Sequence, residues 1–137
     1  MAIVVLGVVA TAAVGVEMMI KTVQLRDSGR VLIPQARWCD GFTSKLRGFT
    51  FRRYLAPTDG LVLVNNKDDR LNSAIHMFFV FFDLAVIWVN TEGVVVDTVL
   101  AKPWRPHYAP QSPARYVIEG HPTILTLVKP GDHITFV

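Results

Sequence analysis

His76 and Asp83 are the only polar side chains in residues 75–89, the run IHMFFVFFDLAVIWV. An imidazole and a carboxylate in so apolar a run could pair with each other, bind a ligand, or hold a metal ion with help from further histidines. None of the four histidines has a sequence-local partner at metal-ligand spacing, the other three being His107, His121 and His133. We therefore favour a structural role, in which each of the two side chains bonds backbone groups at a bend, because buried polar groups are normally hydrogen-bonded.

A second group of candidate binding residues lies in the proline-rich segment 102–113, KPWRPHYAPQSP. Its prolines exclude regular structure over most of the segment, and loops of this length in a compact domain are uncommon and often functional. Aromatic and guanidinium groups on a rigid loop suit a small anion, a sugar or a peptide. The candidate binding residues are therefore His76, Asp83, Trp104, Arg105 and Tyr108, joined by Arg47 and Glu119.

A structural interpretation of these loop residues is also open. Trp104 would then plug the end of a barrel, and Arg105 or Arg47 would pair with Glu119 or Asp83. In that case the loop closes the fold and binds nothing.

The sequence gives no positive sign of an enzyme. It contains no nucleophile elbow and no glycine-rich phosphate loop. Cys39 is the only cysteine, so no intramolecular disulfide, cysteine zinc cluster or CxxC redox pair can form, and a lone thiol beside Trp38 is typical of a small core residue. We expect no catalytic residue, metal or cofactor, although the sequence leaves open whether the protein is an enzyme.

The charge of the chain is mildly basic. Fourteen lysines and arginines against 11 acidic residues give a net charge of +3, which is too small to argue for nucleic acid by itself. The basic residues gather in segment 37–53, which has Asp40 as its one acidic residue. Short basic clusters are common on ordinary surfaces, so we interpret this one as a solvated face and keep nucleic-acid binding as the least supported alternative.

Residues 1–20 are an apolar N-terminal segment ahead of the domain, and we expect them to form an apolar helix. As a helix, residues 2–16 would reach about 22 Å, which is short of the roughly 30 Å hydrocarbon core of a membrane. We favour a membrane anchor that leaves the domain in the cytoplasm, because Lys21, Arg26 and Arg30 follow the apolar run. Translation that starts at Met18 or Met19 would give a cytoplasmic protein instead, and a secretory signal peptide fits less well because no lysine or arginine precedes the run.

Residues 21–137 read as one mainly β domain, long enough for a single core. The runs KTVQL and RVLIP, with RDSG between them, predict a hairpin, and GLVLVNN from Gly60 predicts a strand followed by an exposed loop over 65–70. Phe42, Leu46 and Phe49 recur at helical spacing and predict one short helix over 42–49.

The second half of the domain is predicted from the apolar run onward. We expect residues 75–89 to be buried sheet, with Asp83 marking a bend between two strands, because the run is rich in Phe, Val, Ile and Trp. NTEG at 90–93 predicts a hairpin turn, and VVVDTVL returns antiparallel. ARYVIEG at 114–120 predicts a strand, 122–128 a strand or a short helix, and 130–137 a turn and an edge strand. Because residues 75–89 are almost entirely apolar, we expect both faces of the sheet to be covered there. The predicted fold is a compact barrel-like sheet of antiparallel or mixed strands.

Six segments, read in order, carry a resemblance to a known family. They are CDGFTSKLRGFTFR, GLVLV, IHMFFVFFDLAVIWVN, KPWR, ARYVIEG and GDHITF. Over roughly residues 21–137 the chain resembles the domain-of-unknown-function family 192, and the order of the six segments carries this resemblance. The resemblance implies a compact, mainly β, barrel-like domain with one short helix, and it implies no particular activity.

The hypothesis that follows is a non-catalytic β domain that binds an unknown small ligand or protein partner around loop 103–108, His76 and Asp83. The first alternative is a hydrolase or metal-dependent enzyme that uses His76 and Asp83, with Arg47 or Arg105 holding an anionic substrate. The second is a nucleic-acid binder that uses segment 37–53, whose affinity would fall steeply with salt.

Overall fold

The computed structural model describes residues 19–41, 48–50 and 52–137 of the chain. The apolar segment expected at 1–20 lies almost wholly outside these residues, as do Arg47 and most of the helix expected at 42–49. The described end of that expected helix, residues 48–50, is a turn. Within the described ranges, no helix is long and apolar enough to cross a membrane.

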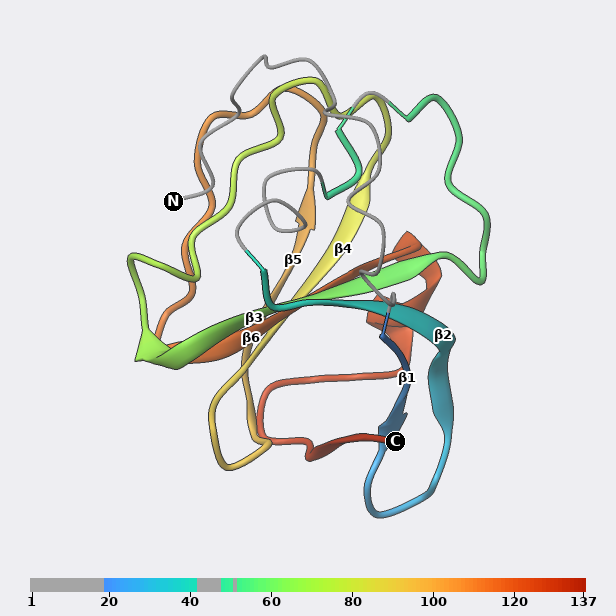
Figure 1. Ribbon diagram of the computed structural model, residues 1–137, viewed down its shortest axis with the longest axis vertical. Helices are drawn as coiled ribbons and strands as arrows, with labels where there is room; N and C mark the ends of the chain where they lie inside the picture. Colours follow the sequence, from blue (N-terminus) through green and yellow to red (C-terminus); the bar gives the residue numbers. More distant parts are fainter. Residues whose placement is uncertain (1–18, 42–47, 51) are drawn as a thin grey trace.

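In the described residues, seven strands form one sheet, in the order β5-β4-β6-β3-β2-β1-β7 (Figure 1). Neighbouring strands are antiparallel except β2 and β3, which are parallel, so the sheet is mixed. A 3-10 helix, η1 (Pro122–Thr126), follows β6. The strands are β1 (Ile20–Leu25), β2 (Val31–Cys39), β3 (Gly60–Asp69), β4 (Leu84–Val89), β5 (Val95–Ala101), β6 (Ala114–Gly120) and β7 (Ile134–Phe136).

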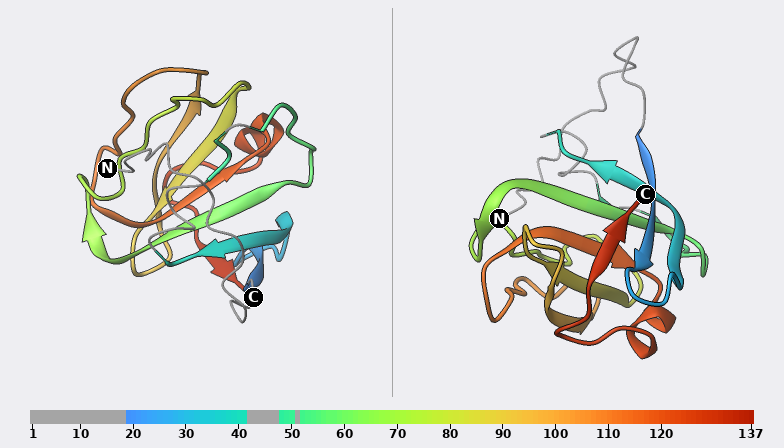
Figure 2. Two further views of the ribbon diagram at one scale, coloured as in Figure 1. Left: turned by 45° about the horizontal axis from the view of Figure 1, so that its top comes forward. Right: turned by 90° about the horizontal axis from the view of Figure 1, so that it is seen from below.

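The sheet curls into a half-barrel, which confirms the mainly β, barrel-like prediction (Figure 2). Its two outer strands are linked, because Val94 and His133 form an isolated antiparallel bridge. The Ile134 N–H donates to the Gly93 carbonyl, and the Val95 N–H donates to the Asp132 carbonyl, both over 2.8 Å. These bonds join the start of β5 to the residues around the start of β7 and hold the curl.

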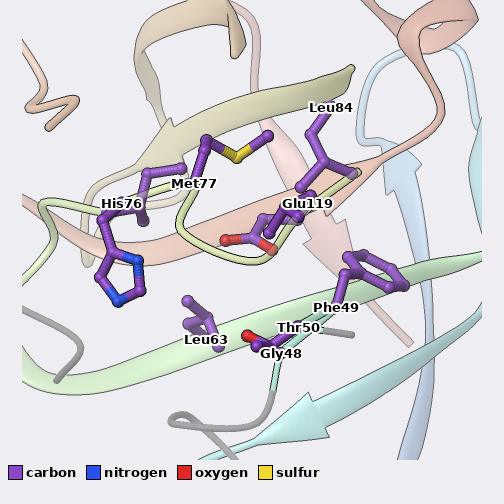
Figure 3. Close-up of a pocket in the computed structure, with 10 residues that line it drawn as sticks. Gly48, Phe49, Thr50, Leu63, His76, Met77, Leu84 and Glu119 are labelled. Carbon is purple, nitrogen blue, oxygen red and sulfur yellow. The ribbon is translucent and has the colours of Figure 1, made fainter. Parts of the chain in front are cut away.

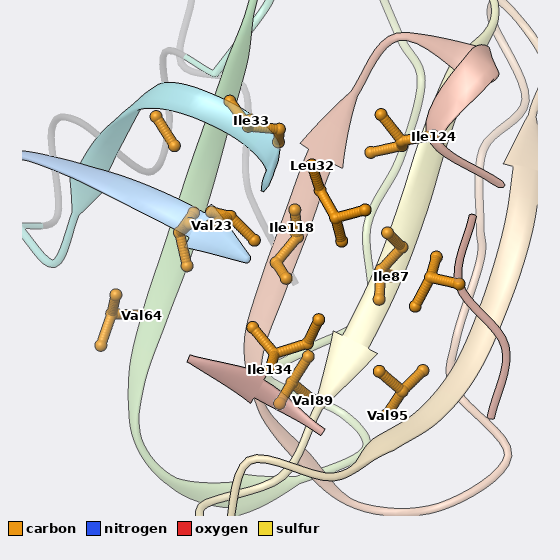
Figure 4. Packing of buried hydrophobic residues seen from close by; sticks show 14 residues of the cluster. Val23, Leu32, Ile33, Val64, Ile87, Val89, Val95, Ile118, Ile124 and Ile134 are labelled. Atoms are coloured by element: carbon orange, nitrogen blue, oxygen red, sulfur yellow. The ribbon is translucent and has the colours of Figure 1, made fainter. Parts of the chain in front are cut away.

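Strand β4 explains why the sequence is so apolar here, since all six of its residues are buried. Ala85, Ile87 and Val89 face the inside of the curl, where they pack with residues such as Ile118 and Ile134 (Figure 4). The alternate residues, among them Val86 and Trp88, pack in a second cluster on the other face. Both faces of this strand are therefore covered, as the sequence predicts.

Two predicted boundaries are wrong. Of the two strands expected within 75–89, the one before Asp83 does not form: Ile75 makes an isolated bridge, and residues 76–83 are a loop with a turn at 78–79. The polar residues 67–69 were expected in a loop, but β3 continues through them to Asp69, which pairs with Ala114. Strand formation depends on which neighbour a segment can pair with, and this overrides residue preference in both places.

The remaining predictions for local structure hold. Gly29 (φ 70°) turns the hairpin of β1 and β2, and Gly93 (φ 85°) turns that of β4 and β5. The loop from 102 to 113 has no helix or strand, β6 has its predicted bounds, and the segment after it is the short-helix alternative. Cys39 is buried at the end of β2, as expected of a core residue.

Candidate functional site

Two loops pair at one end of the sheet. Residues 75–83 and 102–108, called here the paired loops, run side by side before β4 and after β5 (Figure 1). Ile75 and Tyr108 exchange two backbone hydrogen bonds of 2.8 and 2.9 Å. Met77 adds two of 2.8 Å, because its N–H donates to the Arg105 carbonyl and its carbonyl accepts from the Trp104 N–H. Backbone bonds therefore fix the proline-rich loop to the loop of His76.

The paired loops present an aromatic cluster, defined as Phe79, Phe81 and Trp104. The Trp104 ring lies 5.0 Å from that of Phe79 and 5.7 Å from that of Phe81, measured between centroids. Phe81 and Trp104 are each 47% exposed, so the cluster meets solvent. Phe79 and Trp104 have positive φ angles of 60° and 65°, a strained conformation for bulky residues. Such strain persists only where the surroundings enforce it, and it gathers at functional sites.

The charges around the aromatic cluster are mostly basic. Asp83 forms an ion pair with Lys102, with 3.0 Å between its Oδ2 and Nζ, so its charge is compensated. The Lys102 N–H donates to the Tyr108 hydroxyl, which makes Tyr108 a support of the loop. Arg105 is exposed, and no carboxylate in the described part of the chain lies within ion-pair distance of its guanidinium. Among the described residues, Arg105, which follows Trp104 in the chain, is thus a cation without a compensating carboxylate.

A pocket lies beneath the paired loops, and we call it the Glu119 pocket (Figure 3). Its cavity of about 30 Å³ has room for roughly two water molecules. The walls are mainly apolar, and Glu119 is the only carboxylic acid among the lining residues that the structure describes. These are Gly48, Phe49, Thr50, Leu63, Ile75, His76, Met77, Val80, Leu84 and Glu119.

Glu119 is held in the pocket by its place in β6, where it lies between Leu61 of β3 and Val86 of β4. It is 6% exposed, and burial raises the pKa of its carboxyl to about 7, against the opposing effect of the Arg37 charge. Arg37 does not contact the carboxylate. Its guanidinium donates to the Gly48 carbonyl over 3.2 Å and lies 5.6 Å from the Phe49 ring centre.

His76 borders the same pocket from the loop side. Its Nδ1 accepts a hydrogen bond of 3.3 Å from the Phe78 N–H, so the neutral ring carries its proton on Nε2. Asp83 instead forms an ion pair with Lys102. The two polar residues of the apolar run therefore lie in different places, His76 at the pocket and Asp83 on the surface of the paired loops. Across the described ranges, no three His, Cys, Asp or Glu residues are grouped closely enough to hold a metal ion.

The candidate site residues thus divide into two sets. Trp104, Arg105, Tyr108 and Asp83 belong to the surface of the paired loops, whereas His76 and Glu119 line the pocket. Arg47 lies outside the described residues. In the structural interpretation, Arg105 or Arg47 was to pair with Glu119 or Asp83; in the described residues Asp83 pairs with Lys102 instead of Arg105. Trp104, the candidate plug of the barrel, is 47% exposed on the paired loops.

Sequence reasoning missed several members of both sets. Phe79 and Phe81 were counted among buried strand residues, although Phe81 is exposed on the paired loops. Phe49 and Met77 line the pocket and have no polar group that would have marked them. The available signal was the departure of 75–82 from strict alternation of apolar and polar residues, which a loop packed between a pocket and solvent also produces.

Two of the basic residues of segment 37–53 that the structure describes, Arg37 and Arg52, have local partners. Arg37 bonds the Gly48 carbonyl, and Arg52 forms an ion pair of 3.1 Å with Asp59. Both guanidinium groups lie over the ring of Phe49, at 5.6 and 5.5 Å from its centre. These two arginines contact the turn around Phe49, whereas Lys45 and Arg47 of the same segment lie outside the described residues.

The fold and the site together define a small β half-barrel domain with a pocket beneath paired loops. The chain belongs to the family DUF192, described as Uncharacterized ACR, whose model matches residues 23–136. A UPF0127 protein of Thermococcus gammatolerans is 38% identical over 110 residues, which cover 79% of this chain and 70% of that protein. A UPF0127 protein of Pyrococcus furiosus is 32% identical over 108 residues, 77% of this chain and 90% of its own. The resemblance seen in the sequence is confirmed.

Two solved structures share the fold. A protein of Sinorhizobium meliloti 1021, assigned provisionally as a transcription regulator, superposes with a TM-score of 0.76 at 20% identity and covers 89% of this chain and 97% of its own. A protein of unknown function from Novosphingobium aromaticivorans has a TM-score of 0.71 at 23% identity, covering 86% and 84%. At this level of identity the likeness concerns the fold alone.

Proposed function

We propose that this protein is a binding module whose paired loops take up an apolar and acidic segment of a partner protein. The observation that carries the proposal is the exposed aromatic cluster of Phe79, Phe81 and Trp104, fixed in place by four backbone hydrogen bonds between the loops. Aromatic residues and arginine are enriched at protein interfaces and dominate their binding energy.

Rigidity supports this proposal as much as composition. A surface that is already ordered loses little conformational entropy on binding, so more of the contact energy becomes affinity. Two residues with positive φ at the centre of the cluster are held in a costly backbone conformation, which the interloop bonds maintain.

Charge decides the kind of partner. Arg105 lies beside Trp104 with no carboxylate of the described chain to compensate it, whereas Lys102 is paired with Asp83. An acidic side chain on the partner would complement Arg105, and its apolar neighbours would cover the rings. Complementary charge mainly raises specificity and the association rate.

The test selects short peptides from a displayed library and measures their affinity for each variant by fluorescence polarisation of the labelled peptide. We expect the wild type to select peptides that combine apolar and acidic residues. The double substitution Trp104→Ala and Arg105→Ala should weaken them at least about tenfold, as for central interface residues.

The chain offers a matched control in Arg53 and Tyr54, a second exposed arginine and aromatic pair. The double substitution Arg53→Ala and Tyr54→Ala should leave peptide affinity unchanged. Equal binding by wild type and the Trp104 and Arg105 variant would overturn the proposal, as would equal losses in both double variants.

We also propose that residues 1–20 tether the module to a membrane with the domain in the cytoplasm. The support is in the sequence, where apolar residues 2–16 precede Lys21, Arg26 and Arg30. Membrane fractionation of cells that express the full chain, with N-terminal sequencing, tests it. Recovery in the soluble fraction with a start at Met18 or Met19 would reject the tether.

A further inference from the structure

The Glu119 pocket is a second site, separate from the aromatic cluster. The pocket lining includes none of Phe79, Phe81 and Trp104, and it lies on the sheet side of the paired loops. The Glu119 carboxylate lies among the lining residues, between Met77 and the turn at Gly48 and Phe49 (Figure 3). Within the described part of the chain, no side chain or backbone group forms a hydrogen bond or an ion pair with it. Glu119 is 6% exposed, and burying an ionised carboxylate without such a partner costs free energy. A ligand that supplies a partner for the carboxylate would lower this cost.

The shape and chemistry of the pocket limit what the ligand can be. A cavity of about 30 Å³ admits a group of roughly the size of one or two water molecules. Its walls are apolar, with Leu63, Met77 and Leu84 among them, and suit methylene groups. One carboxylate in such a place provides a single strong partner for a compact cation.

A protonated primary amine meets these requirements. Its ammonium group is compact, carries one positive charge and donates up to three hydrogen bonds. The guanidinium of Arg37 is already engaged with the Gly48 carbonyl and the Phe49 ring, and it forms no ion pair with Glu119. We propose that the Glu119 pocket binds the ammonium end of a primary amine, with the Glu119 carboxylate as its counter-ion and the apolar walls around the carbon next to the ammonium group.

The protonation state of Glu119 gives this site a characteristic pH dependence. Burial raises the pKa of the carboxyl to about 7, so roughly a tenth of the sites are ionised at pH 6 and roughly nine-tenths at pH 8. Amine affinity should therefore rise about tenfold between pH 6 and pH 8. The other titratable or charged groups that face this carboxyl in the described structure are Arg37 from β2 and His76 from the paired loops.

The experiment titrates the full chain with methylammonium chloride at constant ionic strength. Backbone amide shifts of Gly48 and Met77, which flank the carboxylate, report binding in NMR spectra. We expect saturable shifts with a Kd of about 10 mM or weaker, as for any ligand of so few atoms, and a Kd about tenfold higher at pH 6 than at pH 8. Methanol, which is neutral, and tetramethylammonium, which is too large, should produce no saturable shift.

The isosteric substitution Glu119→Gln removes the charge and should abolish methylammonium binding. Peptide affinity at the aromatic cluster should be unchanged in this variant, which shows that the fold is intact and separates the two sites. Methylammonium binding that is equal in wild type and Glu119→Gln, or methanol binding that matches methylammonium, would overturn the proposal.

Two sources of the amine are distinguished by two further probes. Ethylammonium represents a small free amine, and N-acetyl-lysine methylamide represents a lysine side chain of a partner protein. Binding of ethylammonium alone would assign the site to small amines, and binding of both would add lysine side chains. Failure of every amine at pH 8 would reject the site.

Discussion

Replacing Glu119 with glutamine should stabilise the protein against unfolding, and this gain over the wild type should be larger at pH 8 than at pH 4. The wild-type carboxyl is buried in β6 with Leu61 and Val86 as its strand neighbours and can lower its cost only by holding a proton. Glutamine has nearly the same shape and never ionises. The variant therefore removes the burial cost of a charge and keeps the packing.

The magnitude follows from the two protonation equilibria of Glu119. In the unfolded chain the carboxyl has its ordinary pKa of 4.5, and in the folded protein burial raises the pKa to about 7. Between these values the folded state binds more protons than the unfolded state, so the free energy of unfolding falls as pH rises. A pKa difference of roughly 2.5, at about 1.4 kcal/mol for each, amounts to about 3 kcal/mol. The loss should be complete shortly above pH 7.

Urea unfolding of both proteins at intervals from pH 4 to pH 8 measures this effect, with the buried Trp88 as fluorescence reporter. The difference in unfolding free energy, variant minus wild type, should increase by about 3 kcal/mol over this range. Glu92→Gln serves as control, because that side chain is exposed on the turn between β4 and β5 and should give a constant difference. A constant difference for Glu119→Gln as well would refute the reasoning.

Three further substitutions test other parts of the structure. Trp88→Phe removes the indole donor that bonds the buried Ser73 carbonyl over 2.7 Å and should lower the unfolding free energy by about 1–3 kcal/mol in urea titrations. Gly93→Ala forces a side chain into positive φ with its Cβ 3.0 Å from a backbone oxygen, and calorimetry should show a loss of about 1–2 kcal/mol. Asp83→Asn breaks a partly exposed ion pair with Lys102 and should change stability by at most about 1 kcal/mol, so a larger loss would show that the pair organises the loops.

The strands that the sequence predicted best are those with an apolar run between clear turn residues. β6 and β4 are apolar and bounded by turn residues, and both appear where the patterns indicate. Residues 76–82 have the same composition, yet they lie beside the proline-rich loop, where only Ile75 finds a bridging partner. Composition reports that a segment avoids water, and it does not report which segment lies alongside it.

The residues of the candidate site could be predicted in part from the sequence, but their grouping could not. The polar residues in apolar surroundings, His76 and Glu119, were visible in the sequence, and they do line one pocket. Their separation from Asp83 was not visible, because it depends on the ion pair with Lys102 that forms only once the two loops are aligned. Aromatic residues gave no signal of exposure, since a phenylalanine on a binding surface and one in a core look alike in sequence.

The pairing of β1 with β7 has a consequence for how the protein folds. Val23 lies opposite Phe136, and the neighbouring residues of β7 approach the start of β5 through His133 and Val94. Contacts between segments so distant along the chain require the closing of a long loop before the contacts contribute any favourable energy. The entropic cost of closing this loop lowers the folding rate of β proteins. Refolding should therefore be limited by the docking of β7. Substitutions in β7 that weaken this docking should lower the refolding rate.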